Sequence, residues 1–374
     1  MKKKMMTGGR DGEGSGRKRR SRLEDSLKRI SKLDRYIPPE KILGAIKLDS
    51  NENFALDAQF VRDIAKEAAS RVDLREYPID ELDQLYGQLG RYAGVDEKYV
   101  AAGSGSDQII ELLLSTLGCR RATVFTPTFS YFVNRCELHD IRVDRVPLGA
   151  NFELRQKEFL KSASRSDLVY ICSPNNPTGN QFGRQTIVDD IIDSLEGRAL
   201  VLVDEAYVDF ADYSLSSEAT RRDNVIVLRT LSKAFGLAGA RVGYMIANQK
   251  FVNVFKSTIQ SPYPISVLSL AIASQVLARS DQVKKTINAV CRERTRVLER
   301  LSRFEGIQAF RSDSNFIFIE TGRNYPAISK SLAAAGIMVK LLGNVAGHRG
   351  CMRVTVGTPE INDRFLQTVE GATR

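Results

Sequence analysis

Six short apolar runs lie between residues 122 and 246, and longer stretches with helical periodicity separate them. The runs are residues 122–125, 143–146, 168–172, 200–203, 225–228 and 242–246. Several are apolar on both faces, as strands of a helix-covered parallel sheet are. Because strands alternate with helical stretches such as residues 108–117 and 185–195, the pattern predicts a doubly wound, mostly parallel α/β domain.

The pattern changes after about residue 280. A long charged segment with helical periodicity, residues 283–304, precedes strand-like runs at residues 315–319 and 352–356. A helix followed by separate strands predicts a small α+β domain. We expect an arm over residues 36–65 that contributes to the small domain, a large domain over 66–280 and the small domain over 281–374.

The net charge of +10 is concentrated in the first 35 residues. They hold thirteen of the 55 Lys and Arg residues but five of the 45 Asp and Glu residues, so the rest of the chain is nearly neutral. This distribution argues against a nucleic-acid-binding face and indicates a basic tail. The first 20 residues have few apolar side chains, and we predict that residues 1–35 are largely disordered.

A short amphipathic helix is predicted from about residue 21. A capping-box pattern opens it, with Ser21 followed by Glu24, and apolar residues then recur at helical spacing. Those apolar residues are Leu23, Leu27, Ile30 and Leu33. We expect this helix to pack on the body of the protein or on a second subunit.

Composition argues against several classes of protein. The N-terminus has no apolar segment of a secretory signal, and no run of 18 apolar residues occurs. The two histidines and five cysteines show no metal-binding spacing, so we expect no metal site and reduced thiols in a cytoplasmic protein. These residues are His139, His348, Cys119, Cys136, Cys172, Cys291 and Cys351.

Polar and glycine-rich segments follow three of the predicted strands. They are residues 173–179, 204–207 and 229–241, and a fourth segment, 103–107, precedes a helical stretch. Each segment alone is typical of an ordinary turn or strand end. Because ligands bind outside the carboxyl ends of strands in such sheets, the combination of a lysine, a carboxylate, an amide, a phenol and an anion-binding loop predicts one cofactor site.

These segments resemble, in their order, motifs of fold-type I pyridoxal-phosphate-dependent aminotransferases, and most closely those of the histidinol-phosphate aminotransferase family. The resemblance extends from about Tyr36 to the C-terminus. Its motifs are residues 48–53, 77–78, 105–107, 127–129, 174–179, 204–207, 229–241 and 353–357. It implies a fold-type I transferase with pyridoxal 5′-phosphate as the cofactor.

The resemblance also assigns the residues around the cofactor ring. It implies that Lys233 binds the cofactor covalently and then acts as the proton-transfer base, which suits a lysine whose pKa is lowered by burial. Asp204 would pair with the ring nitrogen. Tyr207 and Asn176 would donate to the phenolic oxygen, and Phe129 would stack on the ring.

The cofactor phosphate has its own implied binding residues. Tyr77 resembles a tyrosine that this family sends across a subunit interface to the neighbour's phosphate, which implies a homodimer with shared active sites and a dimer contact by the arm. The residues implied within one subunit are Ser106, Asp107, Thr230, Ser232 and Arg241.

Substrate recognition is where the sequence departs from the family. Arg353 resembles the arginine that binds the anionic group of donor and acceptor, and the resemblance adds Tyr36 and Asn51 as substrate-binding residues. Lys340 stands where the family usually has a second arginine, and a lysine offers a point charge rather than a planar fork. Phe54 and Gln108 are further departures, where a proline and a glutamate are usual.

The implied reaction is transamination of histidinol phosphate with 2-oxoglutarate, giving imidazole-acetol phosphate and glutamate in histidine biosynthesis. An aromatic amino-acid aminotransferase and a threonine-phosphate decarboxylase are the alternatives, because they share most of these motifs. A transcription regulator with an aminotransferase-like body would need a DNA-binding domain, and a 35-residue tail is too short for one.

Overall fold

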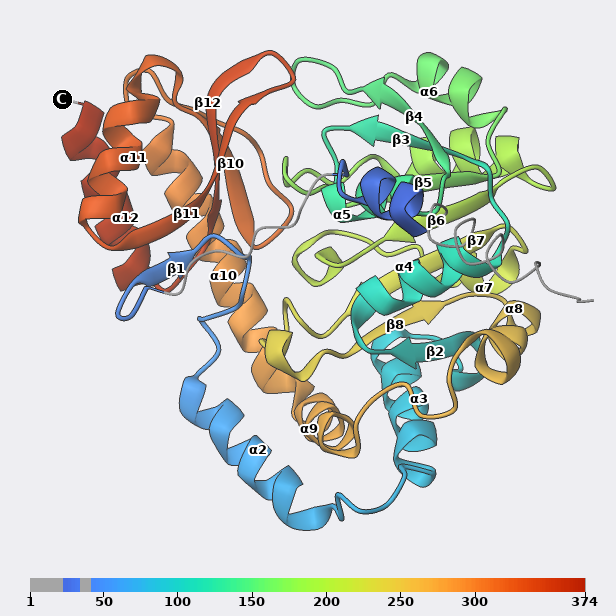
Figure 1. The fold of residues 1–374 in the computed structure, drawn as a ribbon. Helices are drawn as coiled ribbons and strands as arrows, with labels where there is room; N and C mark the ends of the chain where they lie inside the picture. The colour runs from blue at the N-terminus through green and yellow to red at the C-terminus, as the bar shows by residue number, and fades with distance from the viewer. Residues whose placement is uncertain (1–22, 34–41, 374) are drawn as a thin grey trace, which may run out of the picture.

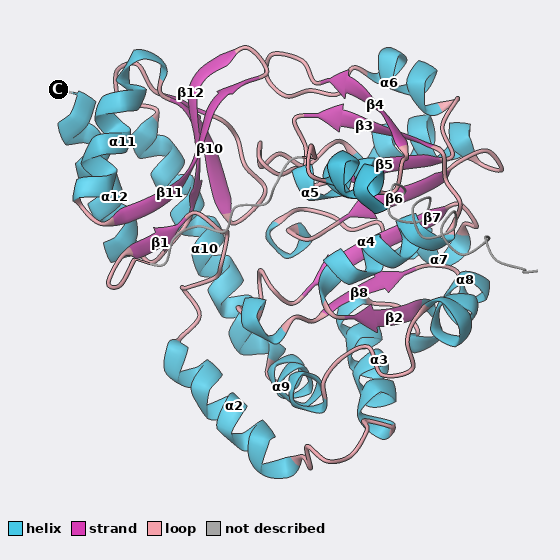
Figure 2. Ribbon diagram, viewed as in Figure 1, coloured by secondary structure: helices cyan, strands magenta, loops and turns pink. Residues whose placement is uncertain are grey.

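Two separate β-sheets organise the chain, and helices cover both of them (Figure 1). The computed structural model describes residues 23–33 and 42–373. One sheet has seven strands and lies in the larger part of the molecule, and the other has five. The two sheets occupy opposite sides of the view in Figure 2, and the functional residues discussed below come from both.

The seven-stranded sheet has the order β2-β8-β7-β6-β5-β3-β4, and all its pairs are parallel except those that β8 makes with β2 and β7. A short loop rather than a crossover helix joins β7 to β8, and this connection lets β8 run antiparallel. The strands are β2 (Val100–Gly103), β3 (Arg121–Thr126), β4 (Arg142–Pro147), β5 (Leu168–Cys172), β6 (Leu200–Asp204), β7 (Val225–Thr230) and β8 (Gly243–Ile246).

Each central strand contributes to two cores, one on either face of the sheet. In β5, Val169 and Ile171 belong to one core, whereas Tyr170 and Cys172 belong to the other. Helices α3 and α9 and segment η2 contribute to the first core, and α4, α5 and α8 contribute to the second. The predicted doubly wound, mostly parallel sheet is therefore confirmed.

The helices around the large sheet come from the segments between its strands and from those just before and after it in the chain. They are α3 (Asp80–Ala93), α4 (Gly105–Thr116), α5 (Ser130–Leu138), α6 (Gln156–Ala163), η2 (Thr186–Ile192), α7 (Ser216–Arg221), α8 (Gln249–Val254) and α9 (Val267–Ala278). Helix α10 (Ser280–Leu301), the longest described helix, runs between the two parts of the molecule, and α2 (Ala58–Arg71) packs beside α9 (Figure 1).

The five-stranded sheet joins the chain's N-terminal arm to its C-terminal part. Its order is β1-β11-β12-β10-β9, and β1 pairs in parallel with β11. Helices α11 (Tyr325–Ala334) and α12 (Pro359–Thr373) cover it. The strands are β1 (Ile46–Leu48), β9 (Gln308–Ala309), β10 (Phe316–Glu320), β11 (Ile337–Val345) and β12 (His348–Thr355). The boundaries proposed for the domains stay a prediction.

The helix predicted near the N-terminus is present over residues 23–30, and its capping residue Ser21 lies outside the described residues. Its side chains Leu23, Leu27 and Ile30 are 60%, 56% and 41% exposed, so the apolar stripe does not pack on the body of this chain. Arg29 pairs with Asp140 at the end of α5. The predicted disorder before residue 23 falls outside the described residues, and no described helix is long and apolar enough to cross a membrane.

Candidate active site

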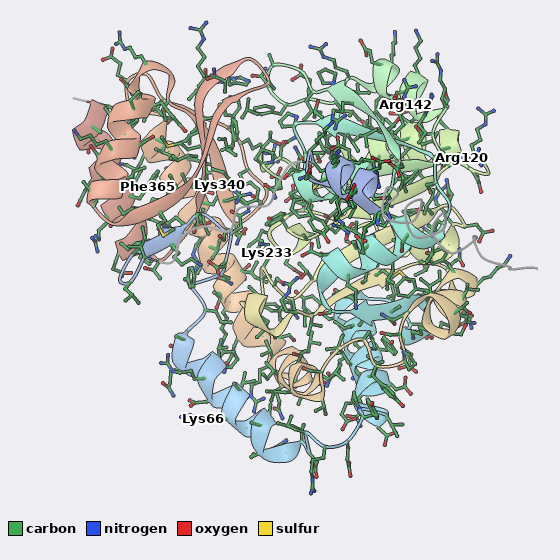
Figure 3. The ribbon with its side chains drawn as sticks, viewed as in Figure 1. Lys66, Arg120, Arg142, Lys233, Lys340 and Phe365 are labelled. Carbon is green, nitrogen blue, oxygen red and sulfur yellow. The ribbon has the colours of Figure 1, made fainter. Side chains whose placement is uncertain are left out.

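A cavity of about 640 Å³ lies between the carboxyl edge of the large sheet and the small sheet. Thirteen of the residues singled out in the sequence line it: Asn51, Ser106, Asp107, Phe129, Asn176, Asp204, Tyr207, Thr230, Ser232, Lys233, Arg241, Lys340 and Arg353. Figure 3 shows Lys233 in the large domain and Lys340 on the small-domain sheet. Tyr77 does not line this cavity, and Tyr36 lies outside the described residues.

Strand register brings the large-domain residues together. Asp204 is the last residue of β6 and pairs with Cys172 at the end of β5, while Thr230 ends the neighbouring β7. Because parallel strands end at one edge, the turns after them face the same space. Lys233 and Tyr207 lie in two of these turns, and Asn176 lies in the turn after β5.

Lys233 is a lysine prepared to act as a base. Burial, reinforced by the positive charge of Arg353, lowers the Lys233 pKa to about 8, because both effects penalise the ammonium form. Its Nζ donates to the Ser50 carbonyl oxygen at 3.0 Å and lies 5.7 Å from the centre of the Tyr207 ring. Near pH 8 a substantial fraction of this amine carries a free electron pair.

Asp204 is a nearly buried carboxylate, 3% exposed, at the tip of its strand. Burial raises its pKa to about 6, although hydrogen bonds oppose the shift. The Tyr170 hydroxyl donates to Oδ2 at 2.6 Å, and the Ala206 amide donates to Oδ1 at 3.0 Å. Such a carboxylate is held in one orientation and gains from a nearby cation.

Hydroxyls, a helix N-terminus and an arginine converge at one end of the cavity. Ser106 lies in the first turn of α4, which begins at Gly105 with a φ of +79°. A Cβ on Gly105 would lie 2.5 Å from Arg241 Nη2, and one on Gly243 would lie 2.2 Å from the Ser106 amide nitrogen. These glycines therefore let the guanidinium and the helix N-terminus approach closely.

The same end of the cavity carries two hydroxyls. Thr230 Oγ1 accepts from the Ser232 amide at 3.1 Å, and the Ser232 hydroxyl accepts from Arg241 at 3.5 Å. Arg241 also pairs with Asp107 at 3.1 Å. Hydroxyl donors, backbone amides and a guanidinium together form a binding site for a phosphate group.

Arg353 and Lys340 form the small-domain wall of the cavity. They are direct partners in the β11–β12 register, so they lie side by side on one face of the sheet. Arg353 donates to the Asn176 Oδ1 at 2.5 Å and to the Asp49 carbonyl oxygen at 2.6 Å. Its buried Nε has no partner within the described chain, and burial lowers the Arg353 pKa, so an anion here would supply both a hydrogen-bond acceptor and a counter-charge.

Tyr207 is held as a neutral hydrogen-bond donor. Burial raises its pKa to about 12, while Arg353 and a hydrogen bond from Asn51 oppose the shift. The Asn51 side-chain amide donates to the Tyr207 hydroxyl at 2.9 Å, which leaves the hydroxyl proton for another acceptor. Phe129 also lines the cavity, and its aromatic face can contact a planar ring.

Tyr77 lies on the surface. Its side chain is 72% exposed and stacks on Tyr263 with ring centroids 4.5 Å apart. Leu74 and Ile79 beside it are 73% and 70% exposed. A tyrosine so placed contributes nothing to the cavity of its own chain, and its predicted role in a neighbouring subunit stays a prediction.

Several residues of the site carried no recognisable sequence signal. Tyr170 lies inside an apolar strand run, yet its hydroxyl orients Asp204. Glu137 of α5 and Arg145 of β4 form an ion pair that lines the outer cavity, although each looks like a surface charge in sequence. Only the three-dimensional arrangement identifies these three residues.

The arrangement fits one cofactor. It combines an amine with a lowered pKa, a fixed carboxylate, a phenol, an aromatic face and a phosphate cradle around one space. These are the groups that pyridoxal 5′-phosphate requires: an attachment point, a partner for its ring nitrogen, a donor to its phenolic oxygen, a stacking surface and an anion site. No group of three or more His, Cys, Asp or Glu side chains in the described residues could hold a metal ion.

Known proteins are similar to this chain in sequence and in fold. The family described as aminotransferase class I and II matches residues 44–369. A histidinol-phosphate aminotransferase of Ruminiclostridium cellulolyticum is 34% identical over 330 residues, covering 86% of this chain and 90% of the relative. Another, of Caldanaerobacter subterraneus subsp. tengcongensis, is 32% identical over 353 residues, covering 93% of this chain and 98% of the relative.

A solved structure has the same fold. It is the histidinol-phosphate aminotransferase from Sinorhizobium meliloti in complex with pyridoxal-5'-phosphate, with a TM-score of 0.81 over 91% of this chain and 96% of that chain. At 23% sequence identity the likeness shows the fold, which is the expected fold-type I architecture.

Proposed function

Because this chain belongs to the aminotransferase class I and II family and is a pyridoxal-phosphate-dependent aminotransferase, we propose that its amino donor is histidinol phosphate. The acceptor is 2-oxoglutarate, and the products are imidazole-acetol phosphate and glutamate, which makes it an enzyme of histidine biosynthesis. The observation that carries the choice of donor is the pair of cations, Lys340 and Arg353, in register on one wall of the cavity.

Two adjacent cations suit a phosphate monoester. Such a group carries a charge of about −1.5 to −2 at pH 7, and a guanidinium can bind two of its oxygens at once. Lys340 adds a second positive charge without a fixed geometry. An aromatic amino acid brings a single carboxylate, for which Arg353 alone suffices.

Pyridoxal 5′-phosphate, when bound, takes up the donor's amino group and withdraws electrons from its Cα. Asp204 would hold the ring nitrogen, Tyr207 and Asn176 would donate to the phenolic oxygen, and Phe129 would cover one face of the ring. The phosphate is held by Ser106, Asp107, Thr230, Ser232 and Arg241. Each of these side chains lines the same cavity, which supports the assignment.

Lys233 moves the proton at the donor's Cα. Its Nζ would be the attachment point for the cofactor and, as a free amine, the base for this proton. Burial and Arg353 lower its pKa to about 8, so the neutral amine is available near the pH of a cell. Asp204, fixed by Tyr170, makes that proton easier to remove because its negative charge keeps the ring nitrogen protonated.

The enzyme is a homodimer in which each subunit completes the other's site. Tyr77 reaches the neighbour's cofactor phosphate. Its 72% exposure supports an interface here, together with the exposed Leu74, Ile79 and Tyr263 around it. Such an apolar patch is left uncovered by the described chain. Tyr36 and Asn51 contribute to the substrate end of the site.

The enzyme acts in the cytoplasm. All five cysteines are free thiols in the structure, as the reducing conditions of that compartment favour. It has three parts: an arm over residues 36–65, a large cofactor-binding domain over 66–280 and a small domain over 281–374. Nucleic acid and membrane are not partners of this reaction.

Single-turnover kinetics with three donors tests the proposal. The cofactor-loaded enzyme is mixed separately with histidinol phosphate, phenylalanine and threonine phosphate, and the absorbance of the bound cofactor is followed. Histidinol phosphate should react at least about tenfold more efficiently than phenylalanine, which has no phosphate, since one charge-assisted contact is worth about 1.5–3 kcal/mol. Faster reaction with phenylalanine would establish the aromatic alternative, and release of carbon dioxide from threonine phosphate would establish the decarboxylase.

A further inference from the structure

The hairpin formed by β11 and β12 reaches across to the large domain at its tip. His348 is the first residue of β12 and pairs with Val345 across the turn. Its Nε2 lies 3.0 Å from the carbonyl oxygen of Ala150, in the large-domain loop between β4 and α6. Figure 1 shows the hairpin extending toward this loop.

His348 contacts hydrogen-bond acceptors on both sides of its ring. Its Nδ1 lies 2.7 Å from Glu320 Oε2 in β10, opposite the contact to the Ala150 carbonyl. A carbonyl oxygen only accepts, and the Glu320 pKa is held below its ordinary value by the Arg349 amide and His348, although burial opposes this. Nε2 is therefore the donor in the contact to Ala150. Glu320 and Arg349 are the charged groups beside the ring, and the loop contributes a neutral carbonyl.

Aromatic packing holds the same contact in place. The His348 ring lies 5.0 Å from the rings of Phe152, in the large domain, and Phe310, in the small domain. Phe152 is 1% exposed and has a φ of +62°, a conformation that disfavours side chains with a Cβ. The loop therefore adopts a strained backbone to place Phe152 between the two domains.

The cations of the substrate site lie on the same hairpin. Lys340 in β11 and Arg353 in β12 are register partners, and His348 begins β12 at the tip of the same hairpin. A shift of the hairpin that includes this pair would move both cations relative to Lys233 in the large domain. We propose that His348 is a positioning residue: by bridging Glu320 and the Ala150 carbonyl, it holds the β11–β12 hairpin where Lys340 and Arg353 can bind the anionic groups of the donor and the acceptor.

This role predicts an effect on KM rather than on kcat. If the bridge is lost, the hairpin is in the binding-competent position only part of the time, and the apparent affinity falls in proportion to that fraction. A saturating substrate restores the competent position, so the chemical step is unchanged. We expect KM to rise roughly three- to tenfold for both histidinol phosphate and 2-oxoglutarate, with kcat within about twofold.

Two substitutions separate the two contacts of the ring. The His348→Gln amide nitrogen takes the place of Nε2 and keeps the contact to Ala150, whereas that of His348→Asn takes the place of Nδ1 and keeps only the contact to Glu320. His348→Gln should retain the wild-type KM, and His348→Asn should show the full rise. His348→Phe keeps the ring packing without either hydrogen bond and should behave like His348→Asn.

His139→Gln is the matched control, because this other histidine pairs with Glu111 inside the large domain. Its KM should not change. Hydrogen exchange of the amides in residues 337–355 gives a readout that needs no substrate, and exchange should quicken in His348→Asn and His348→Phe only. Equal KM values and equal exchange in His348→Gln and His348→Asn, whether normal or impaired, would overturn the inference.

The inference rests on the proposed function, because Lys340 and Arg353 are taken to bind the donor. The two can fail separately. If the wild-type enzyme does not turn over histidinol phosphate, the proposed function fails, and the exchange measurement alone then decides whether His348 holds the hairpin.

Discussion

The two walls of the cavity differ in how firmly they hold their functional side chains. On the large-domain wall, Asp204 and Tyr207 are both 3% exposed, and each has a hydrogen-bond partner that fixes its orientation. On the small-domain wall, Arg353 is also held by two hydrogen bonds, but Lys340 is exposed and no ion pair is found for it within the described part of the chain. The large-domain side chains are thus fixed by their partners, while Lys340 can change with little effect on the fold.

The largest expected effect tests the large-domain wall at its centre. Lys233→Ala should lower turnover by at least about 10⁴-fold, because both the attachment point and the proton-transfer base are removed. Borohydride reduction of the loaded enzyme followed by peptide mapping should place the cofactor on Lys233.

Lys256 is a demanding control for that experiment. Burial lowers its pKa to about 8 as well, but it lies over the Tyr86 ring at 3.5 Å and does not line the cavity. Lys256→Ala should keep the label and most of the turnover. A label on Lys256, or normal turnover in Lys233→Ala, would show that Lys233 is not the residue that binds the cofactor.

A smaller effect is expected for the carboxylate of the same wall. Asp204→Asn keeps the size of the side chain but removes the charge that favours a protonated ring nitrogen, so kcat should fall about 10²- to 10³-fold. Circular dichroism and thermal melting should be close to wild type. Near-normal turnover would mean that the carboxylate has been misassigned.

The small-domain wall should respond selectively. Lys340→Met should cost about 1.5–3 kcal/mol for a phosphorylated donor, or about ten- to a hundredfold in kcat/KM, and much less for phenylalanine or 2-oxoglutarate. Arg353→Met should impair both half-reactions. Lys330→Met, on the exposed face of α11, is the control and should change neither. Equal losses with phosphorylated and unphosphorylated donors would remove Lys340 from the phosphate site and favour the aromatic alternative.

The contrast between the walls also explains what the sequence could predict. The strand at residues 168–172 was predicted with its observed bounds, because an apolar run flanked by turn residues is a strong local signal. β2 was missed because its four residues, Val-Ala-Ala-Gly, are mostly small. β1 has three residues and pairs with β11 nearly 300 residues away, so no local sequence pattern predicts it.

The same limit applies to the site. Lys233 and Asp204 were predicted because one lies in a distinctive turn after a strand and the other at a strand end, and the resemblance to a family gave them roles. The orienting hydroxyl of Tyr170 and the pair of Glu137 with Arg145 depend on side chains that meet only after folding. Lys340 was assigned to substrate binding by resemblance, as the counterpart of a second arginine, and only the register of β11 and β12 shows that it lies beside Arg353.

The pH dependence of cofactor capture tests whether the large-domain wall lowers the pKa of Lys233. Burial and Arg353 lower the Lys233 pKa to about 8, and only the neutral amine attacks. Below pH 8 the neutral fraction falls about tenfold for each pH unit, so the capture rate of cofactor-free enzyme should rise with pH and level off above about 8. Stopped-flow absorbance between pH 6.5 and 9.5 measures this. A midpoint near 10, the ordinary lysine value, would contradict the buried environment.

The smallest expected effect concerns the basic tail, and the question is whether the tail covers the cavity in addition to its two walls. Residues 1–20 lie outside the described residues, and their charge and lack of apolar periodicity predict that they pack on neither domain. Deleting them should change kcat/KM by less than about twofold, since every residue assigned to cofactor or donor lies at or beyond Tyr36. Size-exclusion chromatography with light scattering should show the same oligomer. A matched variant that keeps the length but replaces Arg17, Lys18, Arg19 and Arg20 with serine separates charge from contact. A large loss of activity in the deletion alone would mean that the tail covers the cavity, whereas a loss in both variants would mean that its charge attracts the anionic donor.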